Sequence, residues 1–170
     1  SAEDAQWMRG LAGAWKIGLR EARAEEIPGG EESARSLRYA FLEGLVRRGE
    51  FDRVLTAHQA DDQVETVLFR IVRGTGLRGL RGIPVSRDPG IVRPLLPFWR
   101  SELEGYARLH HLRPRLDPTN ESLRFARNRL RIQVLPLLEA AHPGAREALL
   151  RLARNSERAL EALDALLGER

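Results

Sequence analysis

Residues 58–65 bring together the side chains best suited to chemistry. His58 ends an apolar run, and Asp61, Asp62 and Glu65 follow where a second apolar run begins. Residues three apart share a helix face, so Asp62 and Glu65 are expected to point the same way. Two carboxylates beside an imidazole suit either a divalent metal with nucleotide phosphates, or a cationic amine that must be held and deprotonated. Asp61 is equally explained as an N-terminal acid or cap that interacts with the helix dipole.

A glycine-rich segment follows this group directly. Residues 73–79 read RGTGLRG, and backbone of this kind exposes N–H groups that can close over an anion. Arg73 and Arg78 flank the glycines. Gly74 has a plainer explanation as the residue that ends the preceding helix. The whole segment 74–90 is expected to be a long, mobile loop.

Two arginine clusters have residue types that are suited to bind phosphate groups. In RFARNRLR, a helix would place four polar residues on one face: Arg124, Arg127, Asn128 and Arg131. This stripe suits the phosphates of a nucleotide or of an RNA backbone, and it suits a solvated helix face equally well. The other cluster is ARSLRY, in which the stem of Arg38 could instead cover apolar surface.

Alternating helices and strands are expected to position these groups. Apolar spacing predicts helices over 2–15, 33–49 and 61–74, a loop over 27–33, and short strands over 16–24 and 51–58. This order indicates an α/β fold with a partial parallel sheet flanked by helices. In such a sheet ligands bind outside the carboxyl ends of the strands, and His58 is the last residue of a predicted strand.

The second half of the chain is expected to be mainly helical. An extended segment over 91–98 precedes a helix to residue 111, with Ser101 and Glu104 in the pattern of a capping box. Two further helices are predicted over 117–140 and 143–170. The change in composition predicts two domains, 1–112 and 113–170, the second a helical subdomain with a linker helix.

Composition excludes several classes of protein. The 170 residues are 42% hydrophobic and 31% charged, which excludes a disordered tail and a membrane protein. No apolar run approaches the roughly 20 residues that span a bilayer, and the first ten residues lack the build of a signal peptide. There is no cysteine, which excludes disulfide scaffolds and thiolate zinc sites. A soluble cytoplasmic protein is therefore expected.

Four segments together resemble tRNA(Ile)-lysidine synthases. They are ARSLRY, TAHQADDQVETVLFRIVRGTGLRGL, RPLLPFWRSELEGYA and DPTNESLRFARNRLRIQVLPLLE, in the order and spacing of that family. The resemblance implies the fold of PP-loop (N-type) ATP pyrophosphatases, which is adenine nucleotide alpha hydrolase-like. It also implies a ligase that uses ATP to adenylate the C2 oxygen of the wobble cytidine in a CAU-anticodon tRNA(Ile). Free lysine then displaces AMP and forms lysidine.

The resemblance also implies roles for individual residues. His58, Asp62 and Glu65 would be catalytic and lysine-binding. The ATP or its adenylate would be bound by Arg38, Gly74, Arg131 and Arg127. ATP would act with Mg²⁺, and no metal site made of protein ligands is implied. The expected partners are tRNA(Ile) and free lysine. Separately from the resemblance, exposed sheet edges would favour association with a second copy of the chain in a homodimer.

One departure from the family pattern concerns phosphate binding. Members of the family carry an SGGxDS loop whose backbone amides cradle the pyrophosphate of ATP at a helix N-terminus. Here PGG at 28–30 precedes a different element and lacks the Asp and the Ser. The expectation is a synthase truncated at its N-terminus and inactive by itself. One alternative is another PP-loop tRNA-modifying enzyme, although the lack of cysteine disfavours thiolases that use a cysteine pair. The other alternative is a non-catalytic RNA-binding or interaction remnant of the same scaffold.

Overall fold

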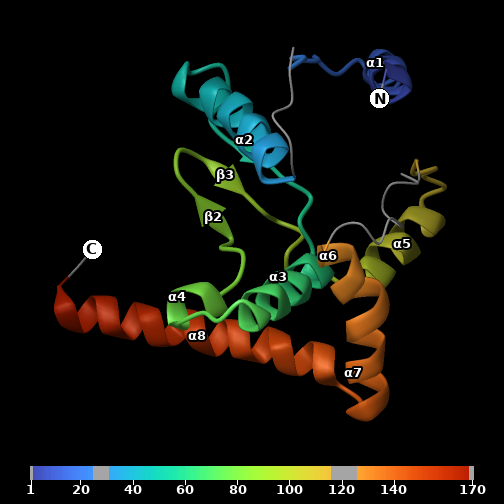
Figure 1. The fold of residues 1–170 in the computed structure, drawn as a ribbon. Helices are drawn as coiled ribbons and strands as arrows, with labels where there is room; N and C mark the ends of the chain where they lie inside the picture. The colour runs from blue at the N-terminus through green and yellow to red at the C-terminus, as the bar shows by residue number, and fades with distance from the viewer. Residues whose placement is uncertain (1, 25–30, 116–125, 169–170) are drawn as a thin grey trace. The chain divides into compact units, whose positions relative to one another are not determined.

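The computed structural model describes residues 2–24, 31–115 and 126–168 (Figure 1). It divides into two compact units, Ser1–Glu50 and Phe51–Arg170. The predicted boundary near residue 112 falls inside the second unit, and the division into domains 1–112 and 113–170 stays a prediction. In the described part of the chain, no helix combines the length and the apolar character needed to cross a bilayer.

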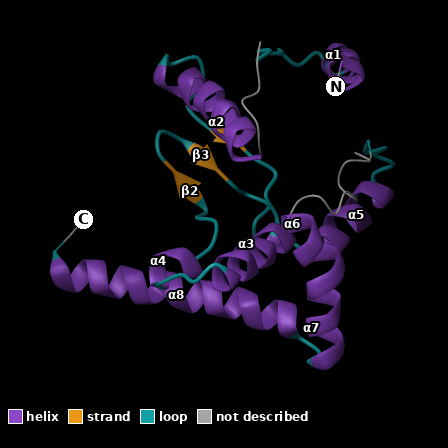
Figure 2. Cartoon of the chain, in the orientation of Figure 1, coloured by secondary structure: helices purple, strands orange, loops and turns teal. Residues whose placement is uncertain are grey.

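Among its described residues, the first unit contains the helices α1 (Ala2–Ala14) and α2 (Glu31–Arg47) (Figure 2). They confirm the helices predicted over 2–15 and 33–49. The strand predicted over 16–24 is wrong. This segment has no regular secondary structure and is mostly exposed, and the described strands pair only with one another. Alternating apolar residues do not make a strand without a neighbour to accept their hydrogen bonds. Most of the predicted loop over 27–33 lies outside the described residues.

The sheet of the second unit is small and mixed. Strand β1 (Val54–Leu55) pairs in parallel with β3 (Ile91–Val92), with Val54 opposite Ile91. Strand β2 (Ser86–Arg87) pairs with the other edge of β3 in the antiparallel direction. The predicted α/β class and its parallel pairing are confirmed, and the antiparallel strand is an addition. Each strand is much shorter than the segments predicted over 51–58 and 91–98.

Helix α3 (Ala60–Val72) follows β1 in the connection to β3 and carries the core. Val64 and Leu68 lie on one face and pack with Leu135 and Leu150, which come from helices of the C-terminal half. Together with Ala60 they recur every four residues, so one stripe of α3 is buried while its other faces remain available for polar contacts. The helix predicted over 61–74 is confirmed, and Gly74 follows it with φ of +73°.

The glycine-rich segment is more ordered than a loop. It contains a one-turn helix, α4 (Leu77–Leu80), and it ends in β2. The guanidinium of Arg70 donates to the carbonyl oxygens of Gly79 and Gly82, each at 2.8 Å. The expectation of one long loop over 74–90 was therefore wrong, because a side chain from α3 holds the backbone of the segment.

Helix α5 (Arg100–Leu109) confirms the helix predicted after the sheet, but its cap differs. The backbone N–H of Trp99 donates to the carboxylate of Glu102 at 2.7 Å, whereas Glu104 forms an ion pair with Arg100. The capping box predicted for Ser101 and Glu104 is therefore wrong by two residues. The helix begins earlier because the N–H of Arg100 already has an acceptor in Asp61.

Between residues 126 and 168, the structure describes a series of helical elements. They are α6 (Ala126–Arg129), the π-helical turn η2 (Leu130–Val134), α7 (Leu135–Ala141) and α8 (Ala145–Leu167). Helix α8 runs beside α3 and α4 (Figure 1). Its first turn is capped by Glu139, which accepts the N–H of Gly144 at 2.7 Å and that of Arg146 at 3.2 Å. These bonds lower the pKa of Glu139.

Candidate active site

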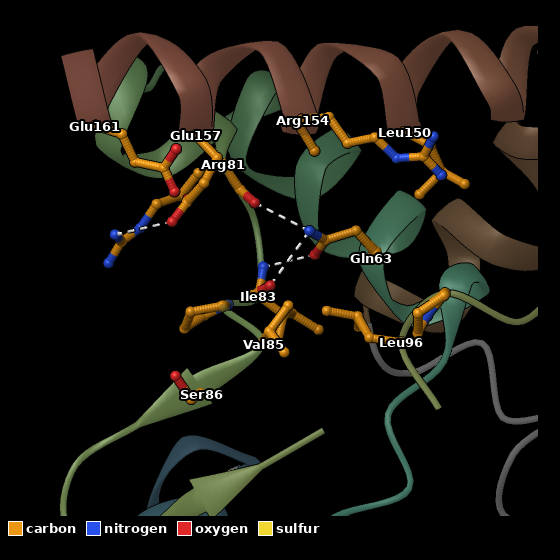
Figure 3. Close-up of a pocket in the computed structure, with 13 residues that line it drawn as sticks. Gln63, Arg81, Ile83, Val85, Ser86, Leu96, Leu150, Arg154, Glu157 and Glu161 are labelled. Carbon is orange, nitrogen blue, oxygen red and sulfur yellow. Dashed lines mark hydrogen bonds and ion pairs between the residues drawn. The ribbon is translucent and has the colours of Figure 1, made fainter. Parts of the chain in front are cut away.

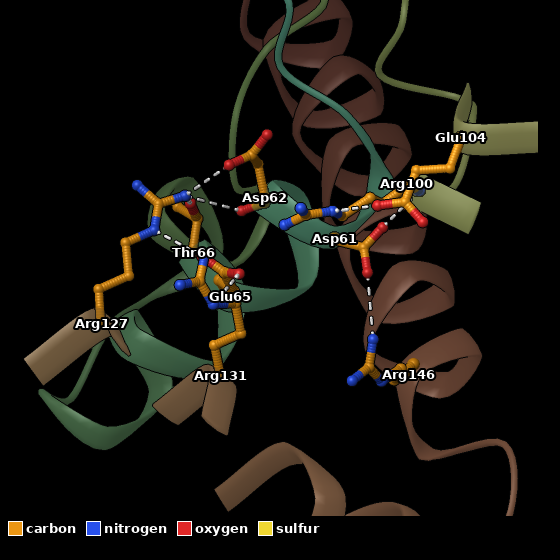
Figure 4. Close-up of polar contacts among 9 residues, drawn as sticks. All are labelled: Asp61, Asp62, Glu65, Thr66, Arg100, Glu104, Arg127, Arg131 and Arg146. Atoms are coloured by element: carbon orange, nitrogen blue, oxygen red, sulfur yellow. Dashed lines mark hydrogen bonds and ion pairs between the residues drawn. The ribbon is translucent and has the colours of Figure 1, made fainter. Parts of the chain in front are cut away.

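The acidic face of α3 meets a guanidinium from α6 (Figure 4). Arg127 donates from Nε to Oε2 of Glu65 at 2.9 Å, and its NH2 group lies 3.4 Å from Oδ1 of Asp62. The same NH2 group also donates to the carbonyl oxygen of Asp62 and to the hydroxyl of Thr66, each at 3.3 Å. The structure therefore brings together Asp62 and Glu65, which were predicted to bind the amine, and Arg127, which was predicted to bind the nucleotide.

Glu65 is the most buried member of this group. Its side chain is 6% exposed, against 31% for Asp62 and 23% for Arg127. Desolvation disfavours the charged form of a carboxylic acid. Burial therefore raises the pKa of Glu65, and the neighbouring Arg127 opposes this increase only in part. A carboxylate with a raised pKa is a better proton acceptor than an exposed one, which is the property required of a general base.

A second guanidinium approaches Glu65 from the next turn. Nε of Arg131 lies 4.0 Å from Oε1 of Glu65, so the two arginines contact different oxygens of one carboxylate. Arg131 lies in the π-helical turn η2. Turns of this kind inside α-helices are frequent at functional sites. The predicted pairing of Arg127 and Arg131 on one face is confirmed, and Arg124 lies outside the described residues.

The two neighbouring aspartates have different partners. Oδ2 of Asp62 accepts the backbone N–H of Gln59 at 3.0 Å and so caps α3. Asp61 faces away from Arg127: it accepts the N–H of Arg100 at 2.8 Å and pairs with Arg146 at 3.1 Å (Figure 4). The interpretation of Asp61 as a helix cap fits these contacts, although the helix it caps is α5. Asp61 joins α3, α5 and α8 and contributes no oxygen to the cluster around Arg127.

The other predicted site residues belong to other segments of the chain. His58 lies between β1 and α3, with Nδ1 3.0 Å from the hydroxyl of Thr56. Gly74 follows the far end of α3, about 18 Å along the helix axis from Asp62 at 1.5 Å per residue. Arg38 is exposed on α2, in the first unit. Their roles in nucleotide or amine binding stay predictions.

Two polar residues of α3 were missed by the sequence analysis. Gln63 is buried, and its amide donates to the carbonyl oxygens of Arg81 and Ile83 and accepts the N–H of Ile83 (Figure 3). Arg70 holds the same segment from the next turns of the helix. In the sequence, only their separation by seven residues indicates that both side chains lie on one face of the helix. They fix the glycine-rich segment to the helix that carries the acidic cluster.

A pocket of about 510 Å³ lies where this segment faces α8. Its lining is mainly apolar, from residues such as Ile83, Leu96 and Leu150, and an ion pair between Arg81 and Glu157 (3.9 Å) lies at its edge (Figure 3). Asp62, Glu65 and Arg127 do not line it. Within the described ranges, no group of three or more His, Asp or Glu residues is placed to hold a metal ion.

Comparison with protein families gives one match that covers most of the chain. A model of the PP-loop domain matches residues 1–138. A likeness in fold agrees with this match. The U34-tRNA thiolase NcsA from Methanococcus maripaludis, solved with its [4Fe-4S] cluster, superposes with a TM-score of 0.66. The superposition covers 91% of this chain and 55% of the thiolase at 18% identity, so it concerns the fold alone.

Curated relatives of the chain are named tRNA(Ile)-lysidine synthase. The protein from Pseudomonas fluorescens is 43% identical over 155 residues, which are 88% of this chain and 35% of the relative. The protein from Gloeobacter violaceus is 36% identical over 174 aligned residues, covering 99% of this chain and 54% of the relative. The chain thus spans about a third to a half of the length of these relatives.

Proposed function

Because the chain belongs to the PP-loop domain family, we propose that it forms part of a tRNA(Ile)-lysidine synthase. The enzyme would be an ATP-dependent C–N bond-forming ligase that joins lysine to C2 of the wobble cytidine in CAU-anticodon tRNA(Ile), through an adenylated tRNA intermediate. Identity of 36–43% to synthases over at least 88% of this chain supports the proposal. The observation that carries it in the structure is the cation-binding cluster formed by Asp62, Glu65 and Thr66 on α3.

This cluster suits the amine half of the reaction. Lysine brings a positively charged amino group, which must be held, lose a proton and then attack carbon. Asp62 and Glu65 supply carboxylate oxygens on one face of a helix, and they bind a guanidinium in the structure. The raised pKa of Glu65 suits it to accept the proton. His58, just before the same helix, is proposed to complete the lysine site.

The nucleotide half is assigned to the basic and glycine-rich parts of the chain. Arg127 and Arg131 would contact the phosphates or the adenylate, since arginine recognises phosphate oxygens through paired N–H donors. The backbone around Gly74 and the side chain of Arg38 are proposed to add to this contact. Mg²⁺ would arrive bound to the phosphates of ATP, because such ions need few protein ligands.

The wider setting follows from the same proposal. The partners are CAU-anticodon tRNA(Ile) and free lysine, and the compartment is the cytoplasm, where both are available. A homodimer is also proposed. In the described residues β1 pairs only with β3, and Leu55 on β1 is 67% exposed, so this edge of the sheet is open to association.

The test uses the complete product of the gene with ATP, lysine and a CAU-anticodon tRNA transcript. The expected result is AMP release that depends on lysine, with one lysine incorporated for each AMP. A transcript that differs only by uridine at the wobble position serves as the control and should release no AMP. AMP release from the uridine transcript without lysine would support a different tRNA modification, such as thiolation, and would overturn the proposal.

A further inference from the structure

We infer that Arg127 occupies the subsite of the substrate amine, and that a bound nucleotide must draw its guanidinium away before lysine can enter. The inference rests on the proposed function and adds to it an order of binding, in which the nucleotide binds first and the amine second. Arg127 would thus serve in two positions, first against Glu65 and then against phosphate.

The acceptor oxygens of the subsite are already in use. Arg127 contacts Oδ1 of Asp62, Oε2 of Glu65 and the hydroxyl of Thr66. Of the two remaining carboxylate oxygens, Oδ2 of Asp62 caps α3 and Oε1 of Glu65 faces Arg131. An ammonium group carries three N–H donors and needs several acceptors when it is removed from water. A second cation can therefore bind only where Arg127 has left.

The charges at the subsite are already balanced. Asp62 and Glu65 carry two negative charges, and Arg127 and Arg131 carry two positive charges at the same place. Because these four side chains together carry no net charge, they do not attract a further cation. When the guanidinium of Arg127 moves to a phosphate, the subsite regains a negative charge. The anion that binds Arg127 thus creates affinity for the amine.

Arg127 can move its guanidinium by rotation about its side-chain bonds. It lies on α6, which has four residues, and the π-helical turn η2 follows immediately. These elements continue into α7 as one helix, so the backbone can stay in place while the guanidinium moves. The contacts of Arg127 with α3 come from its side chain. Their exchange for contacts with a phosphate would cost little in helix structure.

The test measures lysine binding separately from catalysis. Equilibrium dialysis of radiolabelled L-lysine against the complete gene product, at pH 8 and low salt, is done with and without a non-hydrolysable ATP analogue. For the wild type, the analogue should tighten lysine binding by about tenfold or more. Arg127→Gln should bind lysine about tenfold more tightly than the wild type without nucleotide, and the analogue should change its affinity less than about twofold.

Two variants control this measurement. Arg129→Gln removes an exposed arginine from the same helix and should behave as the wild type. Glu65→Gln combined with Arg127→Gln should lose the gained affinity, because the gain needs the freed carboxylate. If Arg127→Gln does not fold by circular dichroism, Arg127→Lys decides. It loses the paired donors but keeps the charge, and it should raise lysine affinity without nucleotide about threefold.

Equal lysine affinity with and without the nucleotide in the wild type would overturn the inference, as would no gain in the arginine variants. Lysine-dependent AMP release in the tRNA assay distinguishes this failure from failure of the proposed function. If AMP release depends on lysine while dialysis shows no effect of Arg127, only the order of binding is wrong. If AMP release does not depend on lysine, the proposed function itself fails.

Discussion

Arg127 and Glu65 are 62 positions apart in the chain, yet Nε of the arginine donates to Oε2 of the glutamate at 2.9 Å. The pair joins α6 to α3 at a point where the carboxylate is buried and the guanidinium is largely covered. A buried carboxylate is tolerated when it is paired, and it becomes destabilising when its partner is removed. The contact is therefore structural as well as chemical, and both roles can be measured.

Removal of Arg127 should destabilise the chain more than removal of both partners together. We expect Arg127→Gln to lower the free energy of unfolding by about 1–3 kcal/mol, because Glu65 is left buried without its main partner. Adding Glu65→Gln should restore part of this loss. Urea unfolding of the two single variants and the double variant gives the coupling directly. A coupling energy near zero would mean that the pair does not form in solution. Arg129→Gln, on the exposed side of α6, should change stability by less than about 0.5 kcal/mol.

The raised pKa of Glu65 predicts how stability depends on pH. Its pKa in the folded chain lies above the ordinary value of 4.5. At pH values between the ordinary pKa and the raised pKa, the folded state binds more protons than the unfolded state. The contribution of Glu65 to stability therefore falls as pH rises through this range. Glu65→Gln cannot titrate. The difference in unfolding free energy between the wild type and this variant should therefore shift against the wild type as pH rises above 4.5. A difference that stays constant with pH would show that Glu65 has an ordinary pKa.

Periodic features of the chain were predictable from the sequence. The helices and the parallel pairing around α3 follow from apolar spacing, which depends only on neighbours a few residues apart. The strand predicted over 16–24 was wrong because a strand also needs a partner, which local sequence does not reveal. The cap of α5 moved to Glu102 for a similar reason, since Asp61 of another helix supplies an acceptor to its first turn.

The candidate site was predictable in its residues but not in its contacts. The spacing of Asp62 and Glu65 placed both carboxylates on one face, and Arg127 and Arg131 on another. That the two faces meet depends on tertiary packing of α6 against α3, which spacing does not encode. Gln63 was missed because a glutamine among acidic residues looks solvated, whereas its amide is buried against backbone groups of residues 81–83.

Two glycines near α3 should respond differently to the same substitution. Gly74 and Gly82 have nearly equal φ angles of +73° and +71°, so alanine costs about 1 kcal/mol of backbone strain at either position. At Gly74 an added Cβ meets open space, but at Gly82 it would overlap the amide of Gln63. Gly82→Ala should therefore lose about 1–2 kcal/mol more stability than Gly74→Ala in urea unfolding. Equal losses would show that Gln63 moves aside without cost. Hydrogen exchange at residues 79–83 should accelerate only in the Gly82 variant.

The neighbouring aspartates Asp61 and Asp62 should separate stability from catalysis. Asp61 contacts Arg100 and Arg146, so Asp61→Asn should lower the melting temperature of the complete gene product by a few degrees while leaving KM for lysine within about twofold. Asp62 contacts Arg127 in the cluster proposed for the amine, so Asp62→Asn should raise KM for lysine by about tenfold or more. The asparagine amide can still accept the N–H of Gln59, which limits the loss of the cap on α3. The decisive measurement is KM for lysine against KM for ATP in both variants. If both aspartates change the two constants equally, their effect is structural and Asp62 has no separate role toward the amine.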